Sequence, residues 1–466
     1  MSGITSTLSL AAQALKAQQL AIQTTGHNLA NSATPGFSRQ RVDLVSAYPS
    51  FEGGVFYGQG VDIAGVQRII DRFAEAELLS LNASVGYADA QSQALLSIQD
   101  AFPTSGGIDA ALSAFFGALS DLTNNPGGTA ERVSLIGKAN ALGNALAQTR
   151  QILGSEQQNF DESIKDAARQ VNTLVSQIAS LNRQISTTEV RGESANDFRD
   201  QRQILLQKLT NLTGATTREE ANGEVTVTVG GLLLVGGDRF ASLQTGALGP
   251  GGMHILTYVT PSGESLDATS LFTQGKIGSL LSLRDVQVQN MIDRLDQLAK
   301  TLVDEVNNQH ALGFDLTGAA GGDFFTPIAA TAGAAANVQV DGAIVANPRR
   351  IAAAAASNTV PGDNRNAQAL VNLQSTSFAS LGGFTLEDNF FSLVGDIGSQ
   401  ALNAQDQSSF KQALLTQAQA RRESVSGVNI DEEMTKLIQF QRAFESSSLL
   451  IRTVDDMYQS LIDMVS

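Results

Sequence analysis

Apolar positions recur at alternating steps of four and three residues through the first thirty residues of the chain. They are filled by Ile4, Leu8, Ala11, Leu15, Ile22 and Leu29, with Gln18 and Thr25 completing the series. This spacing is typical of a coiled coil. It predicts one helix from Ile4 to about Ala30, roughly 40 Å long at ~1.5 Å per residue.

A Pro-Gly turn ends this helix. Pro35 disfavours helical backbone at Thr34, and Pro35-Gly36 suits the two central positions of a type II turn. Residues 38–57 are rich in β-forming side chains and run into a glycine-rich stretch from Gly53 to Gly65. We expect extended chain in this region.

Helical periodicity then returns in stretches separated by polar and glycine-rich breaks. The stretches are Arg68–Ala101, Ile108–Thr123, Thr129–Ser186, Phe198–Leu212 and Ile277–Gln309. Between the last two the pattern changes to period two, which predicts strands. The predicted strands are Glu224–Val229, preceded by the hairpin dipeptide Asn222-Gly223, Leu232–Val235 and His254–Thr260. A small β-rich domain is therefore expected at 213–272.

The chain ends in helix, predicted from Ser408 to Ser466 with one break at Ser426-Gly427. Its apolar seam runs Ile430, Met434, Leu437, Gln441, Phe444, Ser448, Ile451, then shifts by one to Val454, Tyr458, Leu461, Val465. The predicted fold is mainly α with a β-rich inserted domain. We expect a discontinuous multi-domain chain whose N- and C-terminal helices pair as a coiled coil beside a long-helix body. The expected divisions are 1–67, 68–212, 213–272, 273–405 and 406–466.

Composition narrows the possible functions. Of 466 residues, 42% are hydrophobic and 16% charged, and the formal net charge is −16. An acidic chain repels phosphate backbones and anionic lipid, so nucleic-acid binding is not expected. No apolar run reaches the ~20 residues that cross a bilayer, and residues 1–40 do not have the pattern of a cleaved secretion signal. We therefore expect no membrane insertion, and any export must use another route.

Catalytic and metal-binding patterns are missing from the sequence. There is no cysteine, and His27, His254 and His310 are scattered without ligand spacing. The acidic groups Asp431–Glu433 and Asp455-Asp456 are interpreted as solvated helix faces, the first at a helix start where negative charge is favourable. No constellation of acid, base and nucleophile can be drawn. The sequence predicts a protein that is not an enzyme and has no catalytic residues, cofactor or metal.

The N-terminal seam is too poor in large side chains to hold its helix alone. Each such side chain contributes about 1.5–3 kcal/mol when fully buried. Ordering the backbone costs about 1–2 kcal/mol per residue. We therefore expect termini that are loose in the monomer and that become ordered when neighbouring copies supply further contacts.

Several stretches resemble the flagellar rod, hook and junction proteins. The stretch from Asn28 to Gln40 reads NLANSATPGFSRQ and resembles their N-terminal motif. Ser426 to Met434 (SGVNIDEEM) and Leu437 to Phe444 (LIQFQRAF) resemble their C-terminal motif. Within this family the hook-associated branch is indicated by three internal stretches, NDFRDQR from Asn196, GKIGSLLSLRD from Gly275 and VNNQHALGFDL from Val306.

The resemblance implies a structural, extracellular subunit of the bacterial flagellum, exported from the cytoplasm by the flagellar type III apparatus. It would be the adaptor between hook and filament. Implied partners are other copies of the chain, the hook protein, the second hook–filament junction protein and a flagellar export chaperone. The implied assembly interface consists of Leu8, Leu15, Ile22, Leu29, Leu437, Phe444, Ile451, Tyr458 and Leu461. Asn31, Thr34, Pro35 and Gly36 would set the turn out of the inner layer.

Other functions remain open at this point. A hook or rod protein belongs to the same class, although the stretches from Gly275 and from His310 argue against it. Flagellin is a second alternative, but its N- and C-terminal sequences are of a different kind. From another class, a secreted adhesin or enzyme with a β insertion would fit the predicted elements, but no catalytic residue can be named for it.

Overall fold

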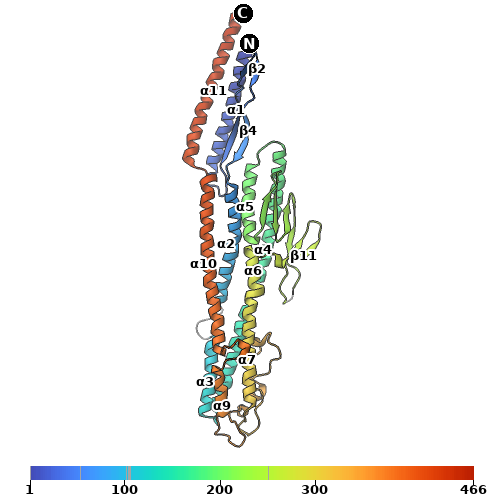
Figure 1. The fold of residues 1–466 in the computed structure, drawn as a ribbon, viewed down its shortest axis with the longest axis vertical. Coiled ribbons are helices and arrows are strands. Elements are labelled where there is room, and N and C mark those ends of the chain that lie inside the picture. Colours follow the sequence, from blue (N-terminus) through green and yellow to red (C-terminus); the bar gives the residue numbers. More distant parts are fainter. Residues whose placement is uncertain (1, 53, 101, 103–106, 250, 466) are drawn as a thin grey trace.

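The computed structural model describes residues 2–52, 54–100, 102, 107–249 and 251–465. The chain forms a long rod, with both termini at the same end (Figure 1). Helix α1 (Ser2–Ala30) descends from this end, and α11 (Ile430–Val465) returns to it. These two antiparallel helices pack against each other and are called the terminal pair below.

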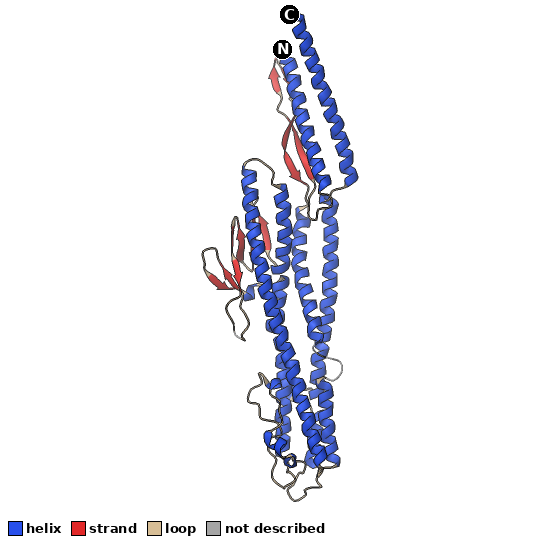
Figure 2. Cartoon of the chain, turned by 180° about the vertical axis from the view of Figure 1, so that it is seen from behind, coloured by secondary structure: helices blue, strands red, loops and turns tan. Residues whose placement is uncertain are grey.

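A β-hairpin flanks the terminal pair on the side of α1 (Figure 2). Strand β1 (Gln40–Ser46) pairs antiparallel with β4 (Val61–Arg68), and the shorter β2 (Ser50–Glu52) pairs with β3 (Val55–Tyr57). Residues 40–68 are called the terminal hairpin. Since α1 contacts α11 as well as β1 and β4, it lies between the hairpin and α11.

Long helices form the body of the rod. They are α2 (Arg72–Asp100), α3 (Ile108–Asn124), α4 (Thr129–Val190), α5 (Asn196–Thr213), α6 (Gly275–Ser282), α7 (Val288–Ala311) and α10 (Leu386–Ser426). Their apolar residues face inward at helical spacing, as Leu135, Leu142 and Leu146 of α4 do. Gly86 allows α2 to approach α5 closely, because a Cβ there would lie 2.0 Å from the carbonyl oxygen of Asn211. The main apolar core therefore belongs to the body.

Two small antiparallel sheets lie on one side of the body. One contains β5 (Thr216–Glu219), β6 (Val225–Val229), β7 (Leu232–Gly236) and β8 (Arg239–Phe240) in that order. The other contains β11 (Ser265–Asp267), β10 (Thr257–Val259) and β9 (Ser242–Gln244). Alternate residues of β6 are buried, which is the period-two pattern seen in its sequence. All these strands fall within the range expected for the β insertion.

Short turns cover the end of the rod farthest from the termini. They are η3 (Ala334–Ala336), α8 (Gly342–Ala346), η4 (Pro348–Arg350), α9 (Arg365–Asn372), η5 (Leu373–Ser375) and η6 (Ala379–Leu381). A further short turn, η1 (Thr269–Leu271), follows the strands of the β insertion instead. Asn307 and His310 of α7 hold this region by bonding to backbone. The Asn307 amide bonds the backbone of Phe324 and Phe325, and His310 Nε2 accepts from the Ala352 N–H over 2.9 Å. These two residues of the stretch from Val306 thus have a structural role.

The predicted helices and the mainly α architecture are confirmed, with three corrections. The expected division at 405/406 lies inside α10, which continues unbroken to Ser426 because it packs along α2. The helix expected over Ile277–Gln309 contains a π-helical turn, η2 (Leu283–Gln287), where Arg284 is buried against Asp161. The strand expected from His254 is shorter and begins at Thr257, since His254 forms only an isolated bridge with Leu248 and its backbone N–H bonds to Asp161.

Candidate assembly interface and its elbow

The terminal pair is held together mainly by small side chains of α1. Among the residues of α1 whose side chains are described, the buried ones are Ala11, Ala17, Ala21, Thr24, Thr25 and Asn28. On α11, Glu433 and Val454 are buried, and Leu437, Phe440 and Ile451 are half-buried. Small residues allow close approach of the helices but bury little apolar area, so the pair is weakly stabilised within one chain.

The residues expected at the assembly interface lie largely outside this buried strip. Leu8 is 43% exposed, and Leu15, Ile22 and Leu29 are half-buried. On α11, Leu437 and Ile451 are half-buried, while Phe444 and Tyr458 are exposed. The side chain of Leu461 lies outside the described part of the structure. The apolar seam read from the sequence is thus only partly used for packing within the chain.

Helix α11 exposes further large apolar side chains that its sequence seam did not single out. They are Ile438, Leu449, Leu450, Met457, Ile462 and Met464. Exposed apolar residues so concentrated on one helix indicate an interaction surface. Either flank of α11 is therefore available to another helix.

The chain leaves α1 through a tight turn. The Thr34 N–H donates to the carbonyl of Asn31 over 2.9 Å, and Phe37 N–H donates to the carbonyl of Thr34 over 3.2 Å. Gly36 has a φ of +79°, as the third position of a type II turn requires. A Cβ at Gly36 would also lie 2.7 Å from Cγ1 of Ile204 on α5. The predicted Pro-Gly turn is confirmed, and it sits directly against the body.

A buried ionic network joins this turn to the body. Asp200 of α5 accepts from the backbone N–H and the hydroxyl of Ser38, each over 2.9 Å, and from Nη1 of Arg68 over 2.5 Å. Arg422 of α10 donates to the hydroxyl oxygen of Ser38 and to the carbonyl of Gly36, both over 2.8 Å. Burial raises the pKa of the nearby Glu75 carboxyl, against the lowering effect of Arg68.

A second set of contacts joins the turn to α11. The side-chain amide of Asn28 donates to the carbonyl of Gln40 and to Oε2 of Glu433, each over 2.8 Å. The Gln40 N–H donates to Oδ1 of Asn28 over 2.9 Å. Asn28 and Glu433 are almost fully buried. Nearby, the Arg39 N–H donates to the Ser426 carbonyl over 2.8 Å. The motifs from opposite ends of the chain are therefore in direct contact.

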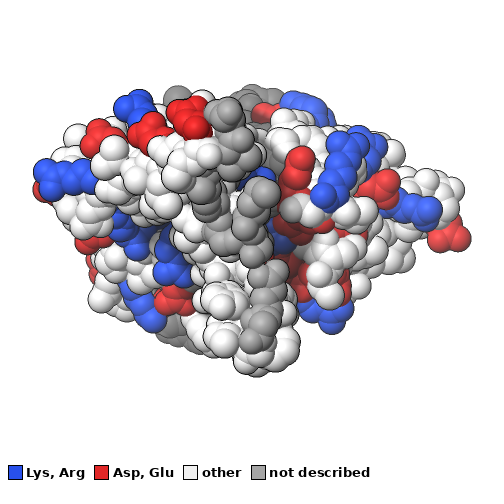
Figure 3. All heavy atoms as spheres, turned by 90° about the horizontal axis from the view of Figure 1, so that it is seen from above, with Lys and Arg blue, Asp and Glu red and all other residues white. Residues whose placement is uncertain are grey.

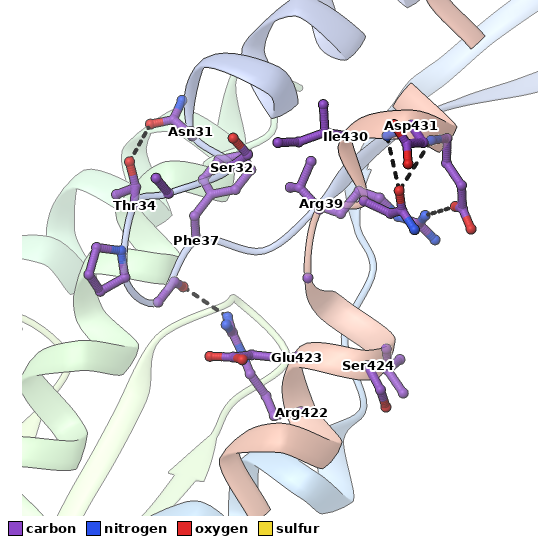
Figure 4. A pocket seen from close by; sticks show the side chains of 18 residues that line it. Asn31, Ser32, Thr34, Phe37, Arg39, Arg422, Glu423, Ser424, Ile430 and Asp431 are labelled. Carbon is purple, nitrogen blue, oxygen red and sulfur yellow. Dashed lines mark hydrogen bonds and ion pairs between the residues drawn. The ribbon is translucent and has the colours of Figure 1, made fainter. Parts of the chain in front are cut away.

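Figure 4 shows the cleft that results where the terminal pair meets the body. It has a volume of about 840 Å³ and is lined by residues 31–37, Arg39, residues 422–425 and residues 427–432. We call residues 31–39 and 426–430 the elbow. Asn429 begins α11 by accepting from the backbone N–H of Asp431 over 3.0 Å, which caps the helix. The cleft brings together no acid, base and nucleophile with catalytic geometry.

The histidines have structural partners. Nε2 of His27 lies 3.2 Å from Oδ1 of Asp197, and Nδ1 of His254 lies 2.5 Å from Oδ2 of Asp161. Burial lowers the pKa of His310, which keeps it neutral so that Nδ1 donates to the Gly322 carbonyl. Within the residues that the structure describes, no group of three or more His, Asp or Glu side chains could hold a metal ion.

The charge pattern of the surface and the character of the helices bear on binding to nucleic acids and membranes. Seen from the end that carries the termini, basic and acidic side chains are interspersed (Figure 3). No broad basic patch is visible on that face. None of the helices in the described part of the chain has the length and apolar character needed to span a membrane.

Comparison with known proteins gives consistent matches. The family model of the flagellar hook-associated protein FlgK helical domain matches residues 95–325, and that of the flagellar basal body rod FlgEFG protein C-terminal region matches residues 420–464. Flagellar hook-associated protein 1 of Escherichia coli (strain K12) is 26% identical over 99% of this chain and 100% of its own length. That of Bacillus subtilis (strain 168) is 27% identical over 98% of this chain and 97% of its own.

A solved structure shares the fold. The flagellar hook junction protein FlgK from Burkholderia pseudomallei aligns with a TM-score of 0.67 and 18% identity, over 75% of this chain and all of that chain. The rod-protein C-terminal match, together with the terminal pair, defines an axial protein of the bacterial flagellum. The helical-domain match and the near full-length relatives narrow this class. The chain belongs to the flagellar hook-associated protein 1 family.

Sequence reasoning did not identify the elbow as a site. Asp200 and Arg68 received no role, although Asp200 belongs to the quoted stretch NDFRDQR and Ser38 to the N-terminal motif. The sequence offered one indication of this site: both stretches are rich in polar residues, whereas the neighbouring helices carry a regular apolar pattern. Only the structure shows that Ser38, Asp200 and Arg422, from three distant parts of the chain, meet at one point.

Proposed function

We propose that this chain is a structural subunit of the flagellum that forms the junction between hook and filament by packing its terminal pair against those of neighbouring copies. The observation that supports this most strongly is the apolar surface of α11, which the chain's own helices leave exposed. Such a surface gains free energy when neighbouring copies cover it. Leu8, Leu15, Ile22, Leu29, Leu437, Phe444, Ile451, Tyr458 and Leu461 are the proposed contributors.

The protein is an extracellular component of the flagellum, and it works without catalysis in this proposal. The body carries the buried core and a set shape, while the terminal pair carries the assembly surface. The elbow fixes how the two are oriented through its buried polar contacts. Asn31, Thr34, Pro35 and Gly36 set the turn out of the inner layer.

The proposed partners are those that the family resemblance implies. In the junction, the subunit contacts other copies, the hook protein and the second hook–filament junction protein. Before export through the type III apparatus, a flagellar chaperone covers the exposed apolar surface of α11. That surface is apolar enough to cause aggregation if left uncovered in the cytoplasm.

Deletion of the gene tests the role directly. Electron microscopy of the deletion strain is expected to show hooks without filaments, and the wild-type gene is expected to restore them. Filaments on the hooks of the deletion strain would refute the proposal.

A matched pair of variants tests the surface of α11. Leu449→Ser and Leu248→Ser both replace a leucine that is more than 60% exposed, one on α11 and one on the β insertion. We expect only Leu449→Ser to reduce the number of filaments. An equal reduction in filament number by the two variants would contradict the role that we give to the surface of α11.

A further inference from the structure

The tip of the terminal hairpin carries a cluster of aromatic side chains in solvent. Tyr48, Phe51, Phe56 and Tyr57 are each between 52% and 92% exposed and are called the aromatic tip. Phe51 and Phe56 are cross-strand partners on β2 and β3 with ring centroids 4.8 Å apart, so they form one continuous patch. Burying such exposed aromatic rings against a partner is favourable, so they mark a contact surface.

In the described part of the chain, no element covers this patch. The terminal hairpin packs on α1 through β1 and β4, and α11 packs on α1 as well. A Cβ at Gly60 would lie 3.0 Å from Cδ1 of Leu10, so the hairpin runs along α1 toward its N-terminus. The aromatic tip thus lies beside the first turns of α1, on the side away from α11 (Figure 1).

A complementary surface lies at the same level on α11. Leu450, Met457 and Met464 follow one another at seven-residue steps and are 39%, 52% and 75% exposed. Residues seven apart lie on one face of a helix, so these three form a stripe. Because the two helices are antiparallel and meet at the elbow through Asn28 and Glu433, the end of α11 lies beside the start of α1.

Charge selects between the possible occupants of this stripe. Helix α11 carries seven acidic and three basic residues. Residues 1–70, which contain α1 and the terminal hairpin, carry three acidic and four basic residues. Two copies of α11 packed side by side would repel each other, whereas α11 against the hairpin side of another copy would not.

We propose that the aromatic tip of one copy packs on the stripe Leu450–Met457–Met464 of a neighbouring copy. The two surfaces lie on opposite sides of α1, so each copy offers one and accepts the other. A contact of this heterologous kind repeats from subunit to subunit instead of closing a dimer. The inference rests on the proposed function, since it requires copies to stack through their terminal pairs.

Paired cysteines test this contact, because the chain has none of its own. Flagella are isolated from deletion cells that produce a Phe56→Cys/Met457→Cys variant and are treated with a short bifunctional maleimide. We expect a ladder of covalent oligomers. Both replaced side chains are exposed, so the monomer keeps its packing. The purified monomer and either single-cysteine variant are expected to give no ladder.

The control pair is Val190→Cys/Met457→Cys, in which the first cysteine lies at the exposed C-terminal end of α4 and no ladder is expected. Incorporation of Phe56→Cys/Met457→Cys into flagella without a ladder overturns the contact. Dimers formed by Met457→Cys alone overturn it as well, since they require two α11 helices to face each other.

The same experiment separates this contact from the function on which it rests. Absence of the wild-type chain from flagella refutes the proposed function, and the contact with it. If the wild type enters flagella and the first pair does not, Tyr57→Cys/Leu450→Cys samples the same contact. A ladder from that pair supports the contact, and failure to enter flagella or to form a ladder overturns it.

Discussion

Replacing Asp200 by asparagine should loosen the elbow. The substitution keeps the shape of the side chain but removes the charge that accepts from Ser38 and from Arg68. The Arg68 and Asp200 side chains are 9% and 7% exposed, so the arginine would be left buried with a neutral partner. The free energy that holds the elbow closed is expected to fall.

The size of the effect follows from the burial of this pair. Removing one partner of a buried ion pair costs about 3–5 kcal/mol. Since about 1.4 kcal/mol corresponds to a tenfold change in an equilibrium constant, local opening should become roughly 100- to 4000-fold more frequent. The backbone N–H groups of Ser38 and Arg39 report it, because they bond to Asp200 and to the Ser426 carbonyl.

Native-state hydrogen exchange measures this opening amide by amide. Asp197→Asn is the matched control on the same helix, because the Asp197 side chain is 56% exposed and its interactions should be worth about 1 kcal/mol or less. The Ala352 N–H, bonded to His310 at the far end of the rod, should not change in either variant. Equal acceleration by Asp200→Asn and Asp197→Asn would refute the role given to the buried network.

Three further changes test other parts of the structure. Gly36→Ala should destabilise the elbow by more than Gly192→Ala destabilises its own turn in thermal unfolding, because both glycines have positive φ but only Gly36 also meets a neighbouring side chain. The body should lose stability as the pH falls below about 6.5, because the lowered pKa of His310 means that the unfolded chain binds the proton more readily. In chemical unfolding, His310→Gln, which can keep one donor and one acceptor, should flatten this dependence, and an unchanged slope would contradict the assignment. Asn28→Ala should leave Glu433 buried with fewer partners and accelerate exchange at the Gln40 N–H, which otherwise bonds to Asn28; unchanged exchange there would count against that bridge.

Much of the fold could be predicted from the sequence, because local pattern determined it. The Pro35-Gly36 turn and the alternation of Val225, Val227 and Val229 each had a local cause, and both appear as expected. The extent of α10 had no such local cause, because the continuation of this helix through residue 405 depends on packing against α2. The π-helical turn around Arg284 likewise depends on Asp161, far away in the sequence.

The elbow and the hairpin surface were not predicted, for a different reason. Ser38, Asp200 and Arg422 come together only in the folded chain, and no spacing in the sequence indicates it. Phe51 and Phe56 were interpreted as ordinary β-forming residues, because sequence cannot distinguish an aromatic residue in a core from one in solvent. The seam of α11 was identified, but its exposure depends on how few large residues α1 contributes.

The central claim is that the two ends of the chain gain their stabilising contacts from neighbouring copies. Limited proteolysis with a non-specific protease tests it on purified monomer and on isolated flagella, with the first cleavage sites identified by mass spectrometry. In the monomer we predict early cleavage within residues 2–30 and 430–465 while the body persists, and resistance of the same segments in flagella. Ends as resistant as the body in the monomer would contradict the claim.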